Sequence, residues 1–436
     1  MFAFIRKHAA YLFNILGILF LVFLAGLSLG VLSWQPAPLL RDVINSAREL
    51  RSNIVNTLSD TPLEHLQTRS HPGNGVVVSD PARMQPGITF LAGLFGNKLG
   101  FRLYAADGTL LHEWPIDFFE VAPDDMRHKF HALMHGTHLY ENGDIVANLV
   151  DRGTVRFDVC GRVLWRNREK THHSIHIDDS SVIWAPSRGP MYNEPGIARV
   201  AFPFDSIKTF DPGTGRKLSE INLVKTLVDS GLTGLVQHYN RKPDDLIHLN
   251  DVEILGHDLA PAFPMFNEGD ILLSSRALQQ IWVLDGADFT IKWRFGGPMH
   301  GQHDPDFNPD GSISVLDNGA SGKPSAENGF AGKLGGSRIR SISPGTGAFR
   351  TLYKSDARNR FYTNQRGKHQ LLANGNILIA ETDAGRAFEV TPNGDVVWSF
   401  VNGWDDTHVG WIMDAARFPD SYRAIADRNC DASGSN

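Results

Sequence analysis

Histidines head a strand-rich phrase that recurs along this chain of 436 residues. One copy begins at His135 and another at His303, and in both a glycine stands eight residues after the histidine. A third copy, which begins at His369, is shorter by two residues. Repeats that carry the same polar residue at the same position are typical of a ring or stack of repeated units, in which several of these side chains face one place. There a neutral imidazole can act as a nucleophile if a neighbour holds its other nitrogen.

Two further phrases could contribute to such a site. His248 and Asn250 stand two residues apart in a strand-like run, so their side chains share one face. Arg276 follows an apolar strand, where an unpaired charge is costly to bury. Its planar fork suits a tetrahedral oxyanion such as sulfate or phosphate, although a salt bridge between units would also satisfy it. The histidines that we expect to converge are His135, His172, His173, His248, His303 and His369.

Metal and cofactor signals are weak. The spacing of a calcium-binding EF-hand loop is followed by Asp306, Asn308, Asp310 and Asp317, with Asp in place of the final Glu. The Pro/Gly-rich flanks of this run instead favour a turn between strands. A spacing similar to that of zinc ligands is shown by His131, His135 and His138, but no helix or supporting partner is evident there. No phosphate-binding loop or dinucleotide motif stands in the right context. We therefore predict no metal and no cofactor.

The elements that must position these residues are short strands. A strand that follows the histidine, a Gly-Asp-Ile or Gly-Asn-Ile step and an outer hairpin that ends in Trp together make a unit of four strands, which is the blade of a β-propeller. We therefore expect an all-β, six-bladed β-propeller with an N-terminal transmembrane helix. A partly helical insertion is expected over 222–245, and the strand-like run from Trp411 to Phe418 is expected to complete an early blade. The six units lie near 86–116, 131–167, 172–222, 246–297, 301–354 and 367–401.

The N-terminal region predicts membrane attachment. Residues 11–33 lack charged side chains and are long enough to cross a bilayer as a helix. Arg6 and Lys7 precede them, so the N-terminus should stay in the cytoplasm and the propeller should lie on the extracytoplasmic, periplasmic side. A cleaved signal peptide is the alternative to a signal anchor. The expected parts are a cytoplasmic N-terminus (1–10), the single span (11–33), a juxtamembrane helix and linker (34–85), the propeller (86–425) and a flexible tail (426–436).

Composition narrows the remaining classes. The apolar content of 42% is enough for a large core, and 42 glycines with 23 prolines suit an all-β chain with many turns. The net charge is −6 and no basic stripe appears, so we expect no nucleic-acid partner. Cys160 and Cys430 fit no metal spacing; they could form one disulfide or remain two unrelated thiols.

Taken in order, these motifs resemble the arylsulfotransferase family of six-bladed propellers over roughly residues 86–425. The elements that match are the His172-His173 pair, His248-x-Asn250, Ser-Ser-Arg276, Trp-Arg-Phe-Gly-Gly, Gln-His303-Asp, and the run from Asp310 through Leu-Asp-Asn-Gly319. The chain departs from the family where Ser174 replaces the Asp that often follows the His-His pair. It departs again where Asp251 replaces the Ser that usually follows His-x-Asn.

The resemblance implies a cofactor-independent, ping-pong transfer of a sulfuryl group from an aryl sulfate to a phenol. His303 would become sulfurylated, and the matching substrate-binding positions are His248, Asn250, Arg276 and His173. We add His369 to them from its place in the repeat. Sulfuryl transfer, like phosphoryl transfer, depends mainly on positioning and electrostatics. The alternative is a non-catalytic, extracytoplasmic propeller that binds a polymer or a protein partner, and a quinone-dependent dehydrogenase propeller is a more distant one.

Overall fold

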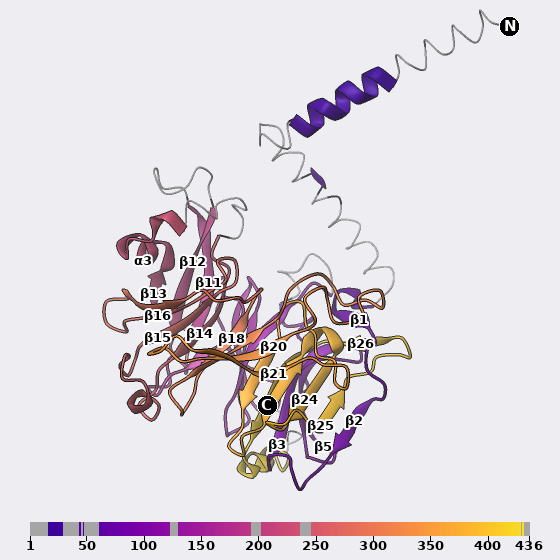
Figure 1. Ribbon diagram of the computed structural model, residues 1–436. Coiled ribbons are helices and arrows are strands. Elements are labelled where there is room, and N and C mark those ends of the chain that lie inside the picture. The colour runs from indigo at the N-terminus through magenta and orange to yellow at the C-terminus, as the bar shows by residue number, and fades with distance from the viewer. Residues whose placement is uncertain are drawn as a thin grey trace, which may run out of the picture. The chain divides into compact units, whose positions relative to one another are not determined.

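The computed structural model describes residues 16–28, 43–44, 47, 61–122, 130–192, 202–235, 246–428 and 430. The chain divides into two units, Met1–Thr61 and Pro62–Asn436. The second unit contains six antiparallel sheets of four or five strands, arranged as the blades of a propeller (Figure 1). The six-bladed, all-β fold predicted from the repeats is confirmed.

Each blade is an antiparallel sheet, and the strand given first for each blade below is the innermost one, next to the central channel. Blade one consists of β27 (Ile412–Phe418), β3 (Ile88–Phe95), β4 (Lys98–Tyr104) and β5 (Leu110–Glu113). Blade two consists of β6 (Met134–Leu139), β7 (Ile145–Leu149), β8 (Gly153–Phe157) and β9 (Val163–Arg166). Blade three consists of β10 (His176–Ile177), β11 (Ile183–Tyr192), β12 (Phe202–Phe210) and β13 (Lys217–Asn222), and helix α3 (Leu223–Asp229) follows it.

The remaining blades repeat this order. Blade four consists of β14 (Leu249–Ile254), β15 (Ile271–Ser275), β16 (Gln280–Leu284) and β17 (Ile291–Phe295). Blade five consists of β18 (His303–Phe307), β19 (Ile313–Asp317), β20 (Arg338–Ile342) and β21 (Phe349–Lys354). Blade six consists of β22 (Lys368–Leu371), β23 (Ile377–Glu381), β24 (Arg386–Val390), β25 (Val396–Val401) and the added outer strand β2 (Gly75–Ser79). Short 3-10 turns are η1 (Leu63–His65), η3 (Ala260–Ala262), η4 (Thr382–Ala384) and η5 (Asp420–Ile425).

Both ends of the propeller unit close the ring. The C-terminal strand β27 pairs with β3 and becomes the innermost strand of blade one, as the strand-like run after Trp411 predicts. At the other end, β2 pairs with β25, and β1 (Leu66–Thr68) pairs with β26 (His408–Gly410). Closure removes the open sheet edges that blades one and six would otherwise present. Strands β1 and β2 lie in the segment expected to be a linker, so the propeller unit begins before residue 86.

The repeating tryptophans join neighbouring blades. The indole N–H of Trp114 donates to the carbonyl of Gly143 in blade two at 2.9 Å. Trp165 of blade two donates in the same way to Pro212 in blade three, at 2.9 Å. Trp398 of blade six donates to Ala106 in blade one, at 3.0 Å. A buried indole needs a partner for its N–H, and in these blades the partner is a turn of the next blade.

A disulfide joins the C-terminal tail to blade two. Cys160, in the turn between β8 and β9, is bonded to Cys430. The sequence left this pairing open, and the bridge places Cys430 on the propeller although it belongs to the segment expected to be a flexible tail. Residues 431–436 lie outside the described residues.

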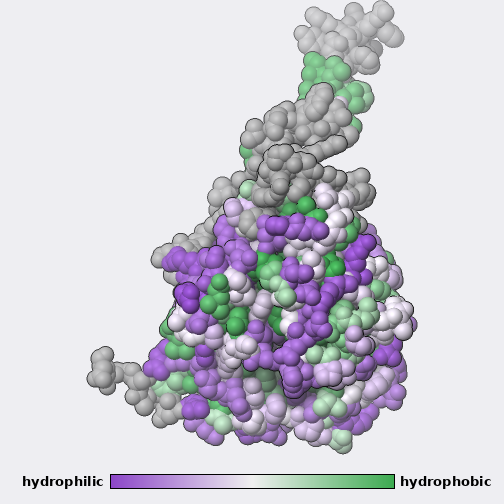
Figure 2. Space-filling view, turned by 90° about the vertical axis from the view of Figure 1, so that its left-hand side faces the viewer, coloured by the Kyte–Doolittle hydropathy of each residue, from purple (hydrophilic) through white to green (hydrophobic). Residues whose placement is uncertain are grey.

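The N-terminal unit corrects one expectation. Its described helix covers residues 16–28, and none of the helices in the described part of the chain is long and apolar enough to cross a membrane. The described residues therefore do not support the predicted transmembrane helix over 11–33. Residues 11–15 and 29–33 lie outside the described residues. The helix is nevertheless apolar on its surface (Figure 2), with exposed Leu16, Ile18, Leu19, Phe20, Leu21, Val22, Phe23, Leu24 and Leu27.

Candidate functional site

Irregular pairing of the innermost strands shapes the channel. Register shifts interrupt β6, β14, β18 and β27 where they pair with their neighbours. In a regular strand, successive side chains point to opposite faces, whereas a bulge re-aims one of them. As a result, Asn250 and its neighbour Asp251 line one cavity, and so do His303 and its neighbour Asp304.

This cavity, called here the central cavity, has a volume of about 30 Å³. It collects side chains from several blades and from the loop before blade six. Its lining residues are His135, His173, Ser174, Asn250, Asp251, His303, Asp304, Arg366, Gly367, Lys368 and Met413.

His303 is held in one tautomer. Its Nδ1 lies 2.9 Å from the carbonyl oxygen of Gly301 and 2.7 Å from Oδ1 of Asn318. Both are acceptors, so Nδ1 carries the proton and Nε2 keeps its lone pair. The orientation of the Asn318 amide follows from its other contacts, because its Nδ2 donates to the carbonyls of Thr363 and Arg366 at 2.9 and 2.8 Å. Burial and the nearby charge of Arg276 lower the pKa of His303 to about 3, so its imidazole is neutral at ordinary pH.

Arg366 faces His303 with its backbone and its side chain. Its amide N–H donates to Nε2 of His303 at 3.3 Å, and its side-chain Nε donates to Nε2 of His135 at 3.1 Å. The guanidinium lies 4.1 Å from the ring centre of Trp411, while its Nη1 is buried and has no hydrogen-bond partner. Burial lowers the pKa of Arg366 to about 10 against the influence of Asp383, and the charge of Arg276 acts in the same direction as burial. The charge of Arg366 therefore lies beside Nε2 of His303, and the charge of Arg276 also acts on this imidazole, so an anion bound there would be stabilised.

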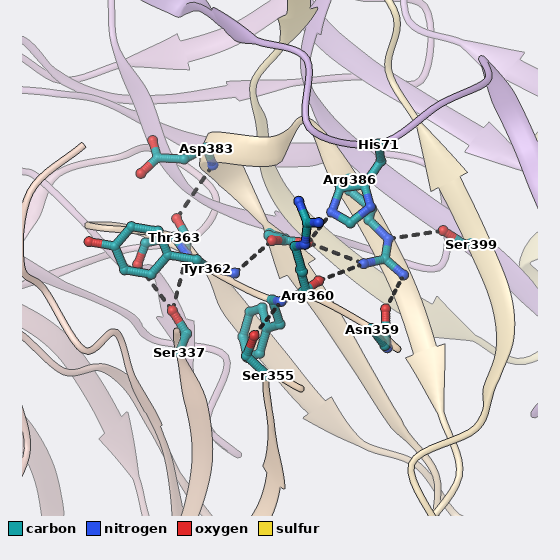
Figure 3. A network of polar contacts seen from close by, with 12 residues as sticks. His71, Ser337, Ser355, Asn359, Arg360, Tyr362, Thr363, Asp383, Arg386 and Ser399 are labelled. Atoms are coloured by element: carbon teal, nitrogen blue, oxygen red, sulfur yellow. Dashed lines mark hydrogen bonds and ion pairs between the residues drawn. The ribbon is translucent and has the colours of Figure 1, made fainter. Parts of the chain in front are cut away.

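The segment that leads to Arg366 is held by a buried network, which Figure 3 shows. The carboxylate of Glu381 accepts the amide N–H of Tyr362 at 2.7 Å and pairs with Arg386 at 3.4 Å. Arg386 also donates to the carbonyl of Arg360 at 3.3 Å. These contacts fix the loop between β21 and β22, and the Asn318 amide then transmits that position to His303.

The His172-His173 turn is fixed in a similar way. Nδ2 of Asn148 donates to the carbonyls of both histidines and of Ser174, at 3.4, 3.0 and 3.0 Å. Nδ1 of His172 lies 2.8 Å from Nδ1 of His173. The backbone of blade two approaches this turn so closely that a Cβ at Gly136 would lie 2.3 Å from the His173 carbonyl oxygen. Only glycine fits there.

Three further histidine rings gather around His173. Its ring centre lies 4.5 Å from that of His135, 5.1 Å from that of His248 and 6.4 Å from that of His303. Burial lowers the pKa values of His135 and His173 well below the ordinary histidine value, so these imidazoles too are neutral. Of the histidines expected to converge, His135, His172, His248 and His303 thus gather around His173, whereas His369 does not.

Backbone strain also concentrates at this site. Non-glycine residues with positive φ include His173 (57°), His248 (49°), Asp304 (57°) and Arg366 (65°). Each such conformation costs about 1–3 kcal/mol and persists where the surroundings enforce it, as at binding and catalytic sites. The four residues come from four different segments, and three of them line the central cavity.

Of the other predicted site residues, Asn250 lines the central cavity, whereas His248 and Arg276 are not among its lining residues. Asn250 lines it, but its Nδ2 donates to the carbonyl of Gln302 at 2.7 Å, and its buried Oδ1 has no partner. His248 contacts His173, and its carbonyl accepts the amide N–H of Arg276 at 3.0 Å. Asn250 therefore supports the strand end beside His303, while His248 and Arg276 lie next to each other at the ends of β14 and β15.

His369 is not among the residues that line the central cavity. Its Nδ1 and its amide N–H contact the Asp304 carboxylate at 3.0 and 2.6 Å, and its Nε2 contacts Ser314 Oγ at 2.8 Å. Lys368 contacts the other oxygen of Asp304 at 2.9 Å. Burial alone would raise the pKa of Asp304, but Lys368 and His369 hold it below its usual range. His369 thus lies behind Asp304 and orients that carboxylate.

The aspartates of these loops are already engaged by protein donors. Asp304, Asp306 and His369 stand close enough to hold a metal ion, yet both oxygens of Asp304 accept hydrogen bonds from blade six. In the loop with EF-hand spacing, Asp310 accepts from the amide of Ser312 at 3.0 Å, as a turn residue does. The expectation of a strand-connecting turn in this loop fits these contacts.

Residues 136–403 match the Arylsulfotransferase (ASST) family. The chain belongs to this family. Among curated proteins, none matches its sequence. Similar solved structures share the fold alone: a protein of unknown function from Bacteroides caccae has 12% identity and a TM-score of 0.46, over 74% of this chain and 97% of that one.

Two other solved structures also resemble the chain. The streptogramin B lyase structure has 14% identity and a TM-score of 0.35, and the match covers 62% of this chain and 69% of that one. The WD40 propeller domain of Doa1 has 12% identity and a TM-score of 0.39, over 80% of this chain and 95% of that one.

A second cavity adjoins the site of this arylsulfotransferase family member. Its volume is about 180 Å³, and Arg366 lines both cavities. Trp411 contributes an aromatic wall, and η1 contributes another wall from the start of the propeller unit. Its lining residues are Glu64, His65, His131, Ala132, Leu133, Val150, Asp151, Arg152, Arg366 and Trp411.

Sequence reasoning missed three residues that hold this arylsulfotransferase-family site together. Asn318 stood within the matching motif and Lys368 directly before His369, both without a predicted role, and Arg366 was not predicted. Their positions could have indicated a role, because Arg366 and Lys368 stand three residues and one residue before the histidine of the third repeat.

Proposed function

We propose that this protein transfers a sulfuryl group from an aryl sulfate to a phenol by a ping-pong mechanism in which Nε2 of His303 is the nucleophile. The observation that carries the proposal is that His303 is held in a single tautomer, with its proton on Nδ1. Gly301 and Asn318 both accept from Nδ1, which leaves the lone pair on the neutral Nε2. An incoming sulfuryl group would displace the Arg366 amide N–H, which contacts Nε2 at 3.3 Å. Membership of the arylsulfotransferase family supports the reaction class.

The cationic surroundings suit the charge of the group transferred. In sulfuryl transfer, as in phosphoryl transfer, charge spreads over three oxygens, and preorganised donors at those oxygens lower the barrier. The buried Nη1 of Arg366, which lacks a partner, and its amide N–H are donors next to His303. Arg276 adds a second positive charge nearby, and His248 and His173 complete the surroundings.

The balance of bonds is simple. In the first half-reaction, the lone pair of Nε2 forms an N–S bond while the aryl oxygen–sulfur bond breaks and the electron pair leaves on the phenolic oxygen. In the second, a phenolic oxygen attacks the same sulfur and the N–S bond breaks, which restores the neutral imidazole. The second cavity, with Trp411 on one wall, would hold the aryl group beside Arg366.

We also propose that the propeller acts outside the cytoplasm. The Cys160–Cys430 bridge supports this, because structural disulfides persist in oxidising compartments.

The test is sulfuryl capture on His303. Brief exposure of the purified protein to para-nitrophenyl sulfate should release para-nitrophenol and add one sulfuryl group to the peptide that contains His303, as read by mass spectrometry. His303→Ala should lose both signals and keep the melting temperature of the wild type. His112→Ala is the matched control. His112 lies on the outer strand of blade one, where it contacts the carbonyl of Val159 at 3.1 Å, so its replacement should leave both signals unchanged. Normal turnover by His303→Ala would instead favour a non-catalytic propeller that binds a polymer or protein.

A further inference from the structure

We propose that Asp251 is the general acid and general base that exchanges a proton with the phenolic oxygen in both half-reactions. The proposal rests on sulfuryl transfer through His303, and it adds the group that handles the proton of the phenol. It concerns a residue at which this chain departs from the family pattern, which usually has Ser in that place.

The position of Asp251 follows from the bulge at the start of β14. The register shifts between Leu249 and Asp251, so Asn250 and Asp251 both line the central cavity with His303. Asp251 is buried, and Ser174 is another lining residue of the same cavity. The Ser174 Oγ accepts the amide N–H of Val252, the residue after Asp251, at 3.0 Å, and this contact holds β14 beside the His172-His173 turn.

Asp304 lines the same cavity but is less suited to this role. Its carboxylate already accepts from Lys368 Nζ at 2.9 Å and from the His369 amide N–H at 2.6 Å. Those charge-assisted bonds keep it ionised. A group that must take up and release a proton cannot be held permanently in one form.

The charges that face Asp251 come from several blades. Lys368 on β22 favours its ionised form, while Asp304 on β18 and Asp414 on β27 disfavour it. Burial, together with the charges of Asp251 and Asp304, raises the pKa of Glu253, two residues further along β14, well above its usual range. Burial is the largest influence, and together these surroundings raise the pKa of Asp251 to about 7. Both protonation states are therefore populated near neutral pH, which is the condition for acid and base work by one group.

Both departures from the family pattern line the central cavity. The family often has Asp where this chain has Ser174, and usually has Ser where this chain has Asp251. The cavity therefore keeps one carboxyl and one hydroxyl group at these two positions, with the carboxyl group on β14.

The proton balances over one cycle. When the donor's aryl oxygen–sulfur bond breaks, the protonated Asp251 gives its proton to the departing phenolic oxygen and becomes a carboxylate. When the acceptor phenol attacks the sulfur bound to Nε2 of His303, the carboxylate takes the phenol's proton. The enzyme returns to its starting state without any other reactant.

The leaving-group dependence of Asp251→Asn tests the proposal. Single-turnover release is measured with phenyl sulfate, whose phenol has a pKa of about 10, and with para-nitrophenyl sulfate, whose more acidic phenol needs no proton to leave. We expect Asp251→Asn to lose about 100-fold or more with phenyl sulfate and less than about 5-fold with para-nitrophenyl sulfate. Asp270→Asn is the matched control. It removes another buried carboxyl group of blade four, paired with Lys292 at 2.9 Å, that does not line the cavity, and it should keep the wild-type ratio between the two donors.

The pH dependence provides a second readout. Transfer from sulfurylated wild-type protein to phenol should slow as the pH falls through about 7, because the carboxylate form of Asp251 is lost. In Asp251→Asn this slope should be absent. Equal losses with both donors, or an unchanged slope in the variant, would overturn the role of Asp251. Failure of the wild type to form the His303 adduct would instead reject the sulfuryl-transfer function itself.

Discussion

Asn318 should control the reactivity of His303 without touching the substrate. Its Oδ1 is one of two acceptors that hold the proton on Nδ1, at 2.7 Å. A hydrogen bond contributes about 0.5–1.5 kcal/mol net, so Asn318→Ala should reduce the population of the attacking tautomer roughly 2- to 13-fold. The same change removes the donors to the carbonyls of Thr363 and Arg366. The Thr363 carbonyl keeps the Ser337 hydroxyl as a donor at 3.3 Å, so the Arg366 carbonyl is the one that loses its donor. An unsatisfied buried carbonyl costs about 1–3 kcal/mol, so the free energy of unfolding should fall by about that amount.

The measurement separates these two effects. Urea unfolding gives the stability, and single-turnover release of para-nitrophenol, normalised to the folded fraction, gives the rate. Asn308→Ala is the control: Asn308 is a buried amide of the same blade that donates to the Ser312 carbonyl at 3.1 Å, in the turn that follows the other end of β18 from His303. It should lower stability and leave the normalised rate unchanged. If Asn318→Ala also lost only stability, the tautomer argument would be refuted.

The remaining predictions concern pH, charge geometry and ring closure. Since burial lowers the pKa of His303 to about 3, the single-turnover rate with para-nitrophenyl sulfate should stay level from pH 8 to pH 5, and an acid limb centred near 6.5 would speak against a neutral buried nucleophile. Arg276→Lys should slow turnover by about tenfold or more at an unchanged melting temperature, because a point charge does not replace a planar fork; full activity would remove Arg276 from the mechanism. Cys430→Ser should lower the free energy of unfolding by about 2–5 kcal/mol in denaturant titrations, and an unchanged midpoint would mean that the bridge does not constrain the unfolded chain. Truncation after residue 405 removes β27 and should sharply lower the melting temperature, whereas a wild-type melting curve would contradict ring closure by β27.

The sequence was informative about the fold because the blade is a local unit. Each unit repeats a short-range pattern of alternating strands and Asp-Gly or Asn-Gly turns, and the tryptophan at its end bonds the next blade. Closure by β27 was also predictable, because an open ring leaves sheet edges unpaired. The strand β2 was not predictable in this way. Its five residues lie in a polar, Pro/Gly-rich stretch, and only pairing with the distant β25 makes them a strand.

The candidate site, too, could be predicted from the sequence only in part. His303 and His173 stand at positions that were expected to converge on a channel, and Asn250 was expected from its place two residues after His248. All three line one cavity. His369 stands at a similar station, yet it lies behind Asp304 because β22 has no bulge to turn its side chain inward. Arg366 escaped notice since it comes from a loop, and its place depends on contacts with Asn318 that no periodicity reveals.

The closure of blade one also has a consequence for biosynthesis. Strand β27 brings Trp411 and Met413 to the two cavities and pairs Ile412 with Gly93, which the ribosome makes hundreds of residues earlier. During translation, blade one therefore waits without its innermost strand until nearly the whole chain has emerged. Loops that close so late fold slowly and leave an unpaired edge exposed in the meantime. The reaction centre is thus assembled by the last strand to be synthesised, and a nascent or prematurely ended chain should have no activity before that strand docks.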